Sequence, residues 1–412
     1  MLRSNNIRNG RLSLDNPSYT DEQNYRVRVR RAVPSEGDIV ITREAPMGEL
    51  CMVPPRLKCC LGQRMVLLRP DRARVVPKFL LYALQSGLVQ SLIQSHEGTG
   101  STVSNLRIPA LEGLTIPLVP KEQQEEVASL LGVLDDRIDN LRLSNEAMEA
   151  IARAIFKSWF VDFDPVRAKV EGREPEGMDA DTAALFPESF QDSRGYMVPS
   201  GWKVVSIREI ATLDKGLSYK GDFLGESGLP MINLGCFLGG GGFDLQKLKF
   251  YSGDFKPRHI VKGGGLVIAN TDITQKRKVI GSPAIVPPSD SNEYLFTHHT
   301  FALRPTLELD GITRYLYFWL LQPSFRERAV GFATGTTVLA LPRDAVLEHE
   351  VVLPEASVLN AFTDLVVSIA ERVNNTSHQL SVLADLRDTL LPRLISGKLR
   401  VPEAEKLVEA VL

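Results

Sequence analysis

Four short motifs occur twice in the chain, in the same order and with nearly the same offset between the two copies. This repeat constrains the fold to two copies of one structural unit. The pairs are TGSTVSNL at Thr99–Leu106 with TGTTVLAL at Thr334–Leu341, LRP at Leu68 with Leu303, KFLLY at Lys78 with RYLYF at Arg314, and DRIDN at Asp136 with ERVNN at Glu371. The offset is 236 residues for the KFLLY pair and 235 for the others. Four matches in order predict a tandem duplication.

Each copy begins with a β-rich module and ends in a long helix. The runs Gly37–Thr42 and Gly265–Ala269 are short, apolar and β-branched, as buried strands are. Short amphipathic helices are expected near residues 77–95 and 312–329. We therefore expect an α+β protein in which two β-rich domains are separated by two long antiparallel heptad helices, a coiled coil, in a pseudo-two-fold tandem repeat.

The two long helices carry apolar residues at alternating spacings of three and four, the heptad pattern of a coiled coil. The seam of the first helix includes Leu131, Leu134, Ile138, Leu141, Met148 and Ile155, and the seam of the second includes Val366, Ile369, Val373, Leu380, Leu383 and Leu390. Either each seam packs on its own domain or the two seams pack on each other, and the narrow period favours the second arrangement. Asn145 interrupts the first seam and is expected to help set the register.

These patterns divide the chain into six segments. We expect a β-rich module 1 at residues 1–118, a helix at 119–163, a linker at 164–200, a β-rich module 2 at 201–350, a second helix at 351–400 and a C-terminal tail at 401–412. The linker is predicted from Glu171–Gly177 (EGREPEG), which is acidic and rich in turn-forming residues.

The net charge of −2 conceals two basic blocks. Residues 1–120 hold 16 Lys and Arg against 10 Asp and Glu, and residues 201–350 hold 17 against 15. The other segments are acidic, so only part of the surface is suited to a polyanion. No apolar run approaches the roughly 18 residues of a membrane span, and the four cysteines fit a reducing compartment. We therefore expect a cytoplasmic protein without a membrane partner.

The sequence lacks the motifs of common enzymes. Asp15–Tyr19 (DNPSY) is similar to a catalytic element of amino-methyltransferases, but no Gly-x-Gly cofactor loop precedes it. Gly239–Gly242 lacks the Lys-Ser/Thr of a phosphate loop, and Cys51, Cys59 and Cys60 lack the Cys-x-x-Cys spacing of zinc sites. We expect the chain to be non-catalytic and to hold no metal.

Three motifs at the helix ends are characteristic. They are Ile116–Glu126 (IPLVPKEQQEE) entering the first helix, Phe156–Asp164 (FKSWFVDFD) at its end, and Leu390–Val401 (LLPRLISGKLRV) at the end of the second helix. Together with the two β-rich modules, they resemble the specificity (S) subunit of type I restriction–modification systems over nearly the whole chain. The resemblance implies a DNA-binding subunit in which each module is a target recognition domain for half of a split, asymmetric site on double-stranded DNA.

The resemblance also implies partners. Methyltransferase (M) subunits that modify adenine, and a restriction (R) subunit, would dock on this scaffold, so S-adenosylmethionine, ATP and Mg belong to those subunits and this chain holds no cofactor. A helix of about 40 residues is about 60 Å long, more than one DNA turn of about 34 Å, so it can act as a spacer. The alternative is a scaffold whose tandem modules bind proteins instead of DNA.

Basic, amide, hydroxyl and imidazole side chains in loops are the candidates for DNA contact, because they reach phosphates and base edges. In module 1 the candidates are Arg43, Arg64, Ser101 and Asn105. In module 2 they are Lys215, Tyr219, Lys220, Lys276, Arg277, Lys278, His298 and His299, among which the run Gln275–Lys278 is the strongest signal. For each candidate the alternative role is that of a solvent-exposed charge or a helix cap that makes no DNA contact.

The two modules differ at their start. Module 2 opens with Pro199–Trp202 (PSGW), and the offset places the counterpart of Trp202 about 33 residues before Met1. Module 1 is therefore expected to lack the counterpart of residues 202–230. We expect it to be the less complete domain, with poorly packed N-terminal residues, through either a misassigned start or a truncation.

Overall fold

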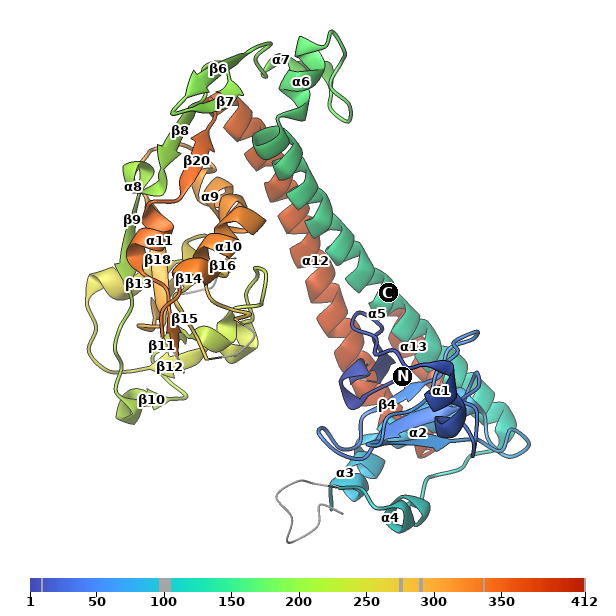
Figure 1. The fold of residues 1–412 in the computed structure, drawn as a ribbon. Coiled ribbons are helices and arrows are strands. Elements are labelled where there is room, and N and C mark those ends of the chain that lie inside the picture. Colours follow the sequence, from blue (N-terminus) through green and yellow to red (C-terminus); the bar gives the residue numbers. More distant parts are fainter. Residues whose placement is uncertain (9, 96–104, 274–276, 289–291, 336–337, 411–412) are drawn as a thin grey trace. The chain divides into compact units, whose positions relative to one another are not determined.

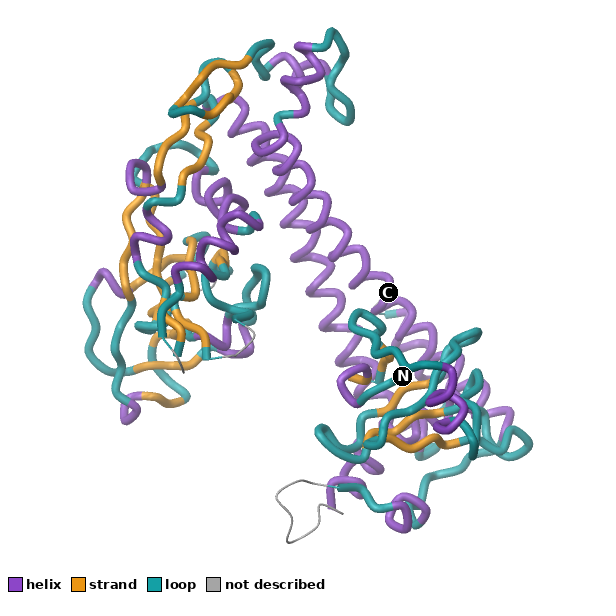
Figure 2. The backbone as a smooth tube through the Cα atoms, viewed as in Figure 1, coloured by secondary structure: helices purple, strands orange, loops and turns teal. Residues whose placement is uncertain are grey.

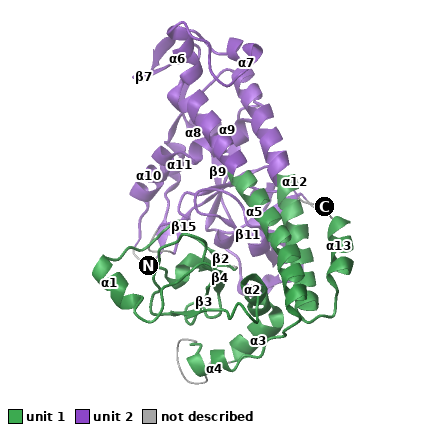
Figure 3. Ribbon diagram, turned by 90° about the vertical axis from the view of Figure 1, so that its right-hand side faces the viewer, with its two compact units in different colours: residues 1–146, 374–412 green, residues 147–373 purple. Residues whose placement is uncertain are grey.

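The computed structural model describes residues 1–8, 10–95, 105–273, 277–288, 292–335 and 338–410, which divide into two compact units. Unit 1 comprises Met1–Glu146 with Asn374–Leu412, and unit 2 comprises Ala147–Val373 (Figure 3). Both units combine helices and strands, so the chain is of the α+β class (Figure 2). Among the described residues, no helix is both long and apolar enough to cross a bilayer.

Module 1 is built on a three-stranded antiparallel sheet in the order β4-β3-β5. Its elements are β1 (Ile7–Arg8), β2 (Arg11–Leu12), α1 (Glu22–Arg28), β3 (Ile39–Thr42), β4 (Leu50–Met52), β5 (Met65–Leu68), α2 (Pro77–Gln85), α3 (Gly87–Ser95) and α4 (Ile108–Glu112). Side chains alternate across a strand, so Ile39 and Ile41 pack on α2 and α3, while Val40 packs on the opposite side with Ile7. Both faces of β3 are therefore buried.

Module 2 contains two larger sheets. The first is antiparallel, in the order β16-β14-β18-β9, and consists of β9 (Ala211–Lys215), β14 (Leu266–Ala269), β16 (Pro283–Ile285) and β18 (Thr300–Pro305). The second is mixed, in the order β10-β12-β11-β17-β13, and consists of β10 (Leu224–Gly225), β11 (Leu229–Ile232), β12 (Lys249–Tyr251), β13 (Ile260–Lys262) and β17 (Glu293–Phe296). Val267 and Ala302 share a cluster with Phe296, so one face of the first sheet packs on the second.

Shorter elements complete unit 2. The helices are α6 (Asp164–Val170), α7 (Ala180–Ala184), α8 (Ile207–Ile210), α9 (Ile312–Leu320), α10 (Pro323–Phe332) and α11 (Arg343–Leu347). The paired strands are β6 (Phe190–Ser193) with β7 (Tyr196–Pro199), β8 (Lys203–Ser206) with β20 (Glu350–Leu353), and β15 (Thr271–Asp272) with β19 (Leu339–Ala340). Ile268 and Leu303 face α9, which covers the other side of the first sheet.

Both units contain segments of two long helices, α5 (Lys121–Lys157) and α12 (Ala356–Ile395; Figure 1). In unit 1, Asp135 forms an ion pair with Arg387, and Asn145 donates a hydrogen bond to Ser377 at 3.1 Å. Since one residue number falls as the other rises, the two segments run antiparallel in this unit. Asn145 thus faces a polar side chain.

The predicted seam residues differ in burial along the helices. Leu131, Leu134, Ile138, Leu383 and Leu390 are buried in one cluster of unit 1, and Val366 is buried in unit 2. The remaining six, Leu141, Met148, Ile155, Ile369, Val373 and Leu380, are half-buried. The unit 1 cluster also includes Phe79 and Tyr82 of α2. In unit 1, therefore, the seams contact both each other and the module, and the two expected arrangements coexist.

The segment at 164–200, expected to be a linker, is instead folded into unit 2. It contains α6, α7, β6 and β7, and Val166, Phe186 and Val198 are buried in the core. The acidic turn at Glu171–Gly177 is only a short part of this segment, and the apolar residues on either side of it carry the packing.

The residues at 401–412, expected to be a tail, include a helix. This helix, α13 (Val401–Glu409), buries Val401, Ala404 and Val408 in the core of unit 1. Their spacing of three and four residues marks an amphipathic helix, a signal that the tail assignment overlooked.

Three pairs of helices start 235 residues apart, the offset of the sequence repeat: α2 and α9, α4 and α11, and α5 and α12. The order β4-β3-β5 matches β16-β14-β18, but no described residue of module 1 forms a counterpart of β9. The expectation of a poorly packed N-terminus is wrong, because Leu2 and Ile7 are buried against Val40 and Met65 of the sheet.

Candidate nucleic-acid interface

The turn at residues 297–299 joins β17 to β18 and gathers imidazole and aromatic rings. The ring centroids of His298 and His299 lie 3.9 Å apart, and that of Tyr219 lies 6.3 Å from His298. The ammonium nitrogen of Lys249 lies 5.9 Å over the ring of Tyr219. A cation held over an aromatic ring beside two imidazoles is an arrangement suited to phosphates and to base edges.

Lys215 ends β9 beside this turn, because β9 pairs with β18 and places Lys215 opposite Phe301. Burial lowers the pKa of His299 below its ordinary value, and the charges of His298 and Lys215 lower it further. The His299 ring is therefore neutral at pH 7, and its Nδ1 shares a hydrogen bond of 2.9 Å with the hydroxyl of Thr271. A neutral imidazole offers one donor and one acceptor, which a charged ring does not.

Four buried polar atoms near the turn have no hydrogen-bond partner within the described ranges. They are Asn270 Oδ1, Thr297 Oγ1, His298 Nδ1 and Thr300 Oγ1. Asn270 is fixed in place, since its amide nitrogen donates to the carbonyl oxygen of His298 at 3.0 Å. Buried polar groups in proteins are nearly always bonded, so this cluster has free capacity for water or for a polar ligand.

Residues 277–280, which include Arg277 and Lys278 of the basic run, form a loop held by side chains. The carboxylate of Asp272 accepts a hydrogen bond from the backbone N–H of Ile280 at 3.1 Å. The guanidinium of Arg326, on α10, donates to the carbonyl oxygens of Arg277 and Ile280. Arg277 and Lys278 are exposed on this loop. The loop therefore presents cations from an anchored backbone.

Three predicted residues of module 1 meet around Glu44. Arg43 donates to Asn105 Oδ1 at 3.0 Å, Asn105 donates to Glu44 at 2.7 Å, and Arg64 pairs with Glu44 at 3.4 Å. The Nε of Arg43 also donates to the carbonyl oxygen of Leu106 at 2.7 Å. Arg43 therefore holds the chain at residues 105–106 against β3, whereas Arg64 presents its charge to solvent.

The structure thus brings together Tyr219, His298 and His299 in module 2 and Arg43, Arg64 and Asn105 in module 1, whereas Arg277 and Lys278 lie on a separate loop. Ser101 and Lys276 lie outside the described residues, and Lys220 is exposed before a short turn of 3-10 helix at Gly221–Phe223. Sequence reasoning missed Lys249, since nothing local marks a β12 residue as a neighbour of Tyr219. Among the described residues, no group of His, Cys, Asp or Glu has the geometry of a metal site.

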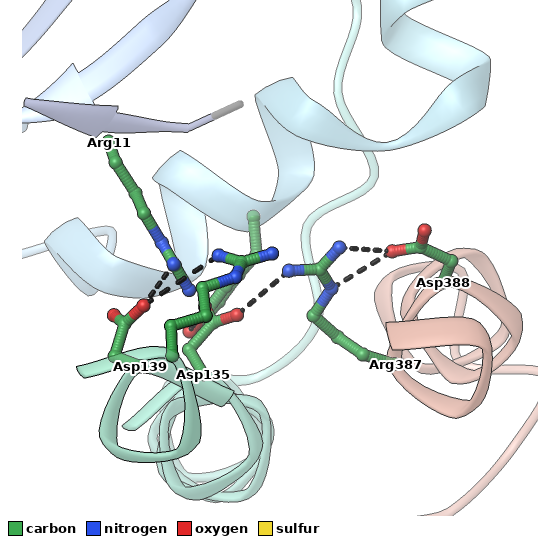
Figure 4. A network of polar contacts seen from close by, with 7 residues as sticks. Arg11, Asp135, Asp139, Arg387 and Asp388 are labelled. Carbon is green, nitrogen blue, oxygen red and sulfur yellow. Dashed lines mark hydrogen bonds and ion pairs between the residues drawn. The ribbon is translucent and has the colours of Figure 1, made fainter. Parts of the chain in front are cut away.

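A polar network in unit 1 connects module 1 to both long helices (Figure 4). Arg11 of β2 pairs with Asp139 of α5. The hydroxyl of Tyr82, on α2, donates to Asp135 at 2.7 Å, and Arg387 of α12 bonds the other oxygen of Asp135 at 3.0 Å. Burial and the neighbouring Asp135 carboxylate raise the pKa of Tyr82, so its hydroxyl remains a donor. Asp135 of α5 therefore contacts both α2 and α12, and it fixes the positions of these three helices along one another.

Replacing Arg387 with methionine is expected to lower the free energy of unfolding by about 1–3 kcal/mol, because a half-buried Asp135 loses its counter-ion. Urea denaturation followed by circular dichroism measures the loss. The double variant with Asp135→Leu removes both charges and is expected to regain part of the stability. Additive losses in the double variant would show that the two side chains are not coupled.

The sequence model of the family described as "Type I restriction modification DNA specificity domain" matches residues 8–149. The MjaIX specificity subunit of Methanocaldococcus jannaschii is 24% identical over 89% of this chain and 79% of its own length. The HindI specificity subunit of Haemophilus influenzae is 24% identical over 82% of this chain and 81% of its own length.

A solved structure shows a similar fold. The S subunit of the type I restriction–modification system from M. genitalium superposes with a TM-score of 0.51 at 19% identity, covering 96% of this chain and 91% of that one. The family match in module 1 and the similarity to whole specificity subunits agree with the motifs at the helix ends. Residues 8–149 thus match the DNA specificity domain, and the chain is similar over most of its length to specificity subunits of type I restriction–modification systems.

Proposed function

We propose that the chain reads a split, asymmetric site on double-stranded DNA, with module 1 on one half and module 2 on the other. The observation that carries this proposal is the group of side chains at the 297–299 turn, where Tyr219 with Lys249 over its ring lies beside His298 and His299, and where four buried polar atoms have no partner among the described residues. Cations of this kind bind phosphates, and imidazole, amide and hydroxyl groups hydrogen-bond base edges. The group around Arg64 and Asn105 is the corresponding candidate in module 1.

In this proposal the long helices form an antiparallel coiled-coil spacer within a tandem repeat. The 37 residues of α5 correspond to about 56 Å at 1.5 Å per residue, which exceeds one DNA turn of about 34 Å. Adenine-specific M subunits and an R subunit dock on this scaffold. They bring S-adenosylmethionine, ATP and Mg, and the specificity chain itself performs no catalytic step.

The DNA affinity of a complex with the M subunits tests the cationic part of the proposal. Each phosphate contact contributes about 0.9 to the slope of log affinity against log salt. The double variant K249A/R277A is expected to reduce that slope by about 2 and to weaken binding on all sequences alike. Lys203→Ala removes an exposed cation on β8, outside the group, and serves as the control. Binding that does not depend on salt would favour a protein-binding scaffold.

Base reading is tested by sequencing the methylated sites. His299→Ala is expected to relax recognition in one half of the site and to leave the other half unchanged, because the group belongs to module 2. Equal relaxation of both halves, or an unchanged site, would contradict the assignment of the 297–299 turn to one half.

A further inference from the structure

Unit 2 contains a cavity of about 590 Å³, to which the β6–β7 hairpin, the helices α9 and α10, and the strand β20 all contribute side chains. Small-molecule sites in proteins have volumes of roughly 300–1,000 Å³. Buried apolar side chains provide much of the lining, namely Phe160, Phe163, Val198, Val204, Trp319 and Val351. The cavity therefore has the size and the lining to hold an aromatic or apolar group.

Four charged side chains also line this cavity, and only one of them is left without a partner for its charge. Three bond to neighbouring side chains, in the pairs Arg194 with Glu209, Glu348 with Arg208, and Glu350 with Tyr196. The fourth, Arg328, forms no ion pair within the part of the chain that the structure describes. The net charge that the cavity offers to a ligand is therefore positive.

The guanidinium of Arg328 is held in place without a carboxylate. Its Nε donates to the carbonyl oxygen of Ala345 at 2.8 Å, and its central carbon lies 4.7 Å from the centre of the Phe332 ring. These contacts orient the planar group, and a guanidinium fixed in this way binds a carboxylate through strong, directional hydrogen bonds. A ligand with a carboxylate thus complements the unpaired cation.

His349 contributes a second polar group that the protein leaves unbonded. Its side chain lines the cavity and is 8% exposed, and its Nε2 has no hydrogen-bond partner among the described residues. Burial, together with the charge of Arg328, lowers the pKa of His349 to about 4, so the ring is neutral at pH 7 and can carry a proton on Nε2. Leaving a buried donor unbonded is unfavourable, and the oxygen of a ligand supplies an acceptor.

We propose that this cavity binds a small aromatic carboxylate. The ring of the ligand lies among Phe160, Val198 and Trp319, and its carboxylate accepts hydrogen bonds from Arg328. Nε2 of His349 donates to the same carboxylate, and because this atom is buried, the imidazole ring turns slightly to reach the ligand. This inference does not depend on DNA binding.

The probe is 3-phenylpropionate, which joins an aromatic ring to a carboxylate. Isothermal titration calorimetry with the full chain is expected to show saturable binding at 1:1. The neutral 3-phenylpropanamide keeps the ring and lacks the charge, whereas acetate keeps the charge and lacks the ring. Each is expected to bind about tenfold more weakly or worse, since each loses one of the two contacts. This comparison needs no variant of the protein.

A variant then tests the cation. Arg328→Gln is expected to weaken 3-phenylpropionate binding about tenfold and to leave the affinity for 3-phenylpropanamide unchanged, because the amide never paired with the charge. Circular dichroism establishes that the variant folds, and if it does not, the comparison of the three ligands on the parent chain decides. Lys203→Ala is the matched control, because it removes an exposed cation of β8 that does not line the cavity.

Hydrogen exchange locates the bound probe. Exchange is expected to slow at residues 194–198 and 348–352, which line the cavity. Three results would each overturn the proposal: no saturable binding of 3-phenylpropionate, equal binding of 3-phenylpropanamide or acetate, or protection confined to residues outside the lining of the cavity. The last result would mean that the ligand binds elsewhere on the chain.

Discussion

Replacing Phe156 with alanine is expected to lower the free energy of unfolding of unit 2 by about 3–5 kcal/mol. The side chain is 0% exposed, and its ring lies 5.3–5.6 Å from five other rings, those of Phe160, Tyr315, Phe318, Trp319 and Phe362. These rings come from α9, α12 and the π-helical turn Ser158–Asp162 that follows α5. Truncation leaves a cavity where α5, α9 and α12 meet, and the rigid elements around it cannot collapse to fill it.

Urea denaturation followed by tryptophan fluorescence measures this loss, because all three tryptophans of the chain, Trp159, Trp202 and Trp319, lie in unit 2. Ile151→Ala is the matched control, since Ile151 lies on the same helix and is 52% exposed. Its effect is expected to stay within about 0.5 kcal/mol. Similar losses for the two variants would show that the aromatic cluster is not the main contact of α5 in this unit.

Phe156 also shows why the heptad pattern located the helices but not every contact. A strict heptad continued from Leu134 leads through Leu141 and Met148 to Ile155, which is half-buried. Six turns of a helix with 3.6 residues per turn span about 22 residues and lead instead to Phe156. The stripe that faces the core drifts by about 20° per heptad when a helix does not supercoil to compensate. The strict heptad from Leu131 therefore reaches the buried Ala152 and Trp159 but does not include Phe156.

The candidate interface was predictable only in part. Lys215, Tyr219 and the two adjacent histidines stand out in the sequence as basic or aromatic residues near strand ends, and the structure brings them together. Lys249 joins them through sheet pairing, which no local pattern reveals. Arg43 shows the reverse error, because its role depends on the carbonyl oxygen of Leu106, 63 residues away. Sequence patterns identify side-chain chemistry, whereas long-range pairing determines which groups are already bonded within the protein.

Unit 2 is expected to lose about 3 kcal/mol of stability as the pH falls from about 6.5 to about 4, because of His349. This side chain is 8% exposed. Burial lowers its pKa to about 4, and the charge of Arg328 acts in the same direction. Between the ordinary pKa of about 6.5 in the unfolded chain and the pKa of about 4 in the folded chain, His349 is protonated only when the chain is unfolded. Folding therefore becomes less favourable as the pH falls. The contribution is fully present above about pH 6.5, and each pH unit below that removes about 1.4 kcal/mol until about pH 4.

The test compares urea denaturation of the parent chain and of His349→Gln at several pH values, again by tryptophan fluorescence. Glutamine cannot be protonated. The slope of unfolding free energy against pH between 6.5 and 4 is therefore expected to become shallower by about 1.4 kcal/mol per pH unit, which is the contribution of one bound proton. His378→Gln is the control, because His378 is exposed on α12 and its replacement should leave the slope unchanged. The carboxylates titrate in the parent chain and in both variants, so their contribution to the slope cancels when the slopes are compared. If His349→Gln keeps the parent slope, the acid sensitivity of unit 2 belongs to its carboxylates, and burial of His349 does not control it.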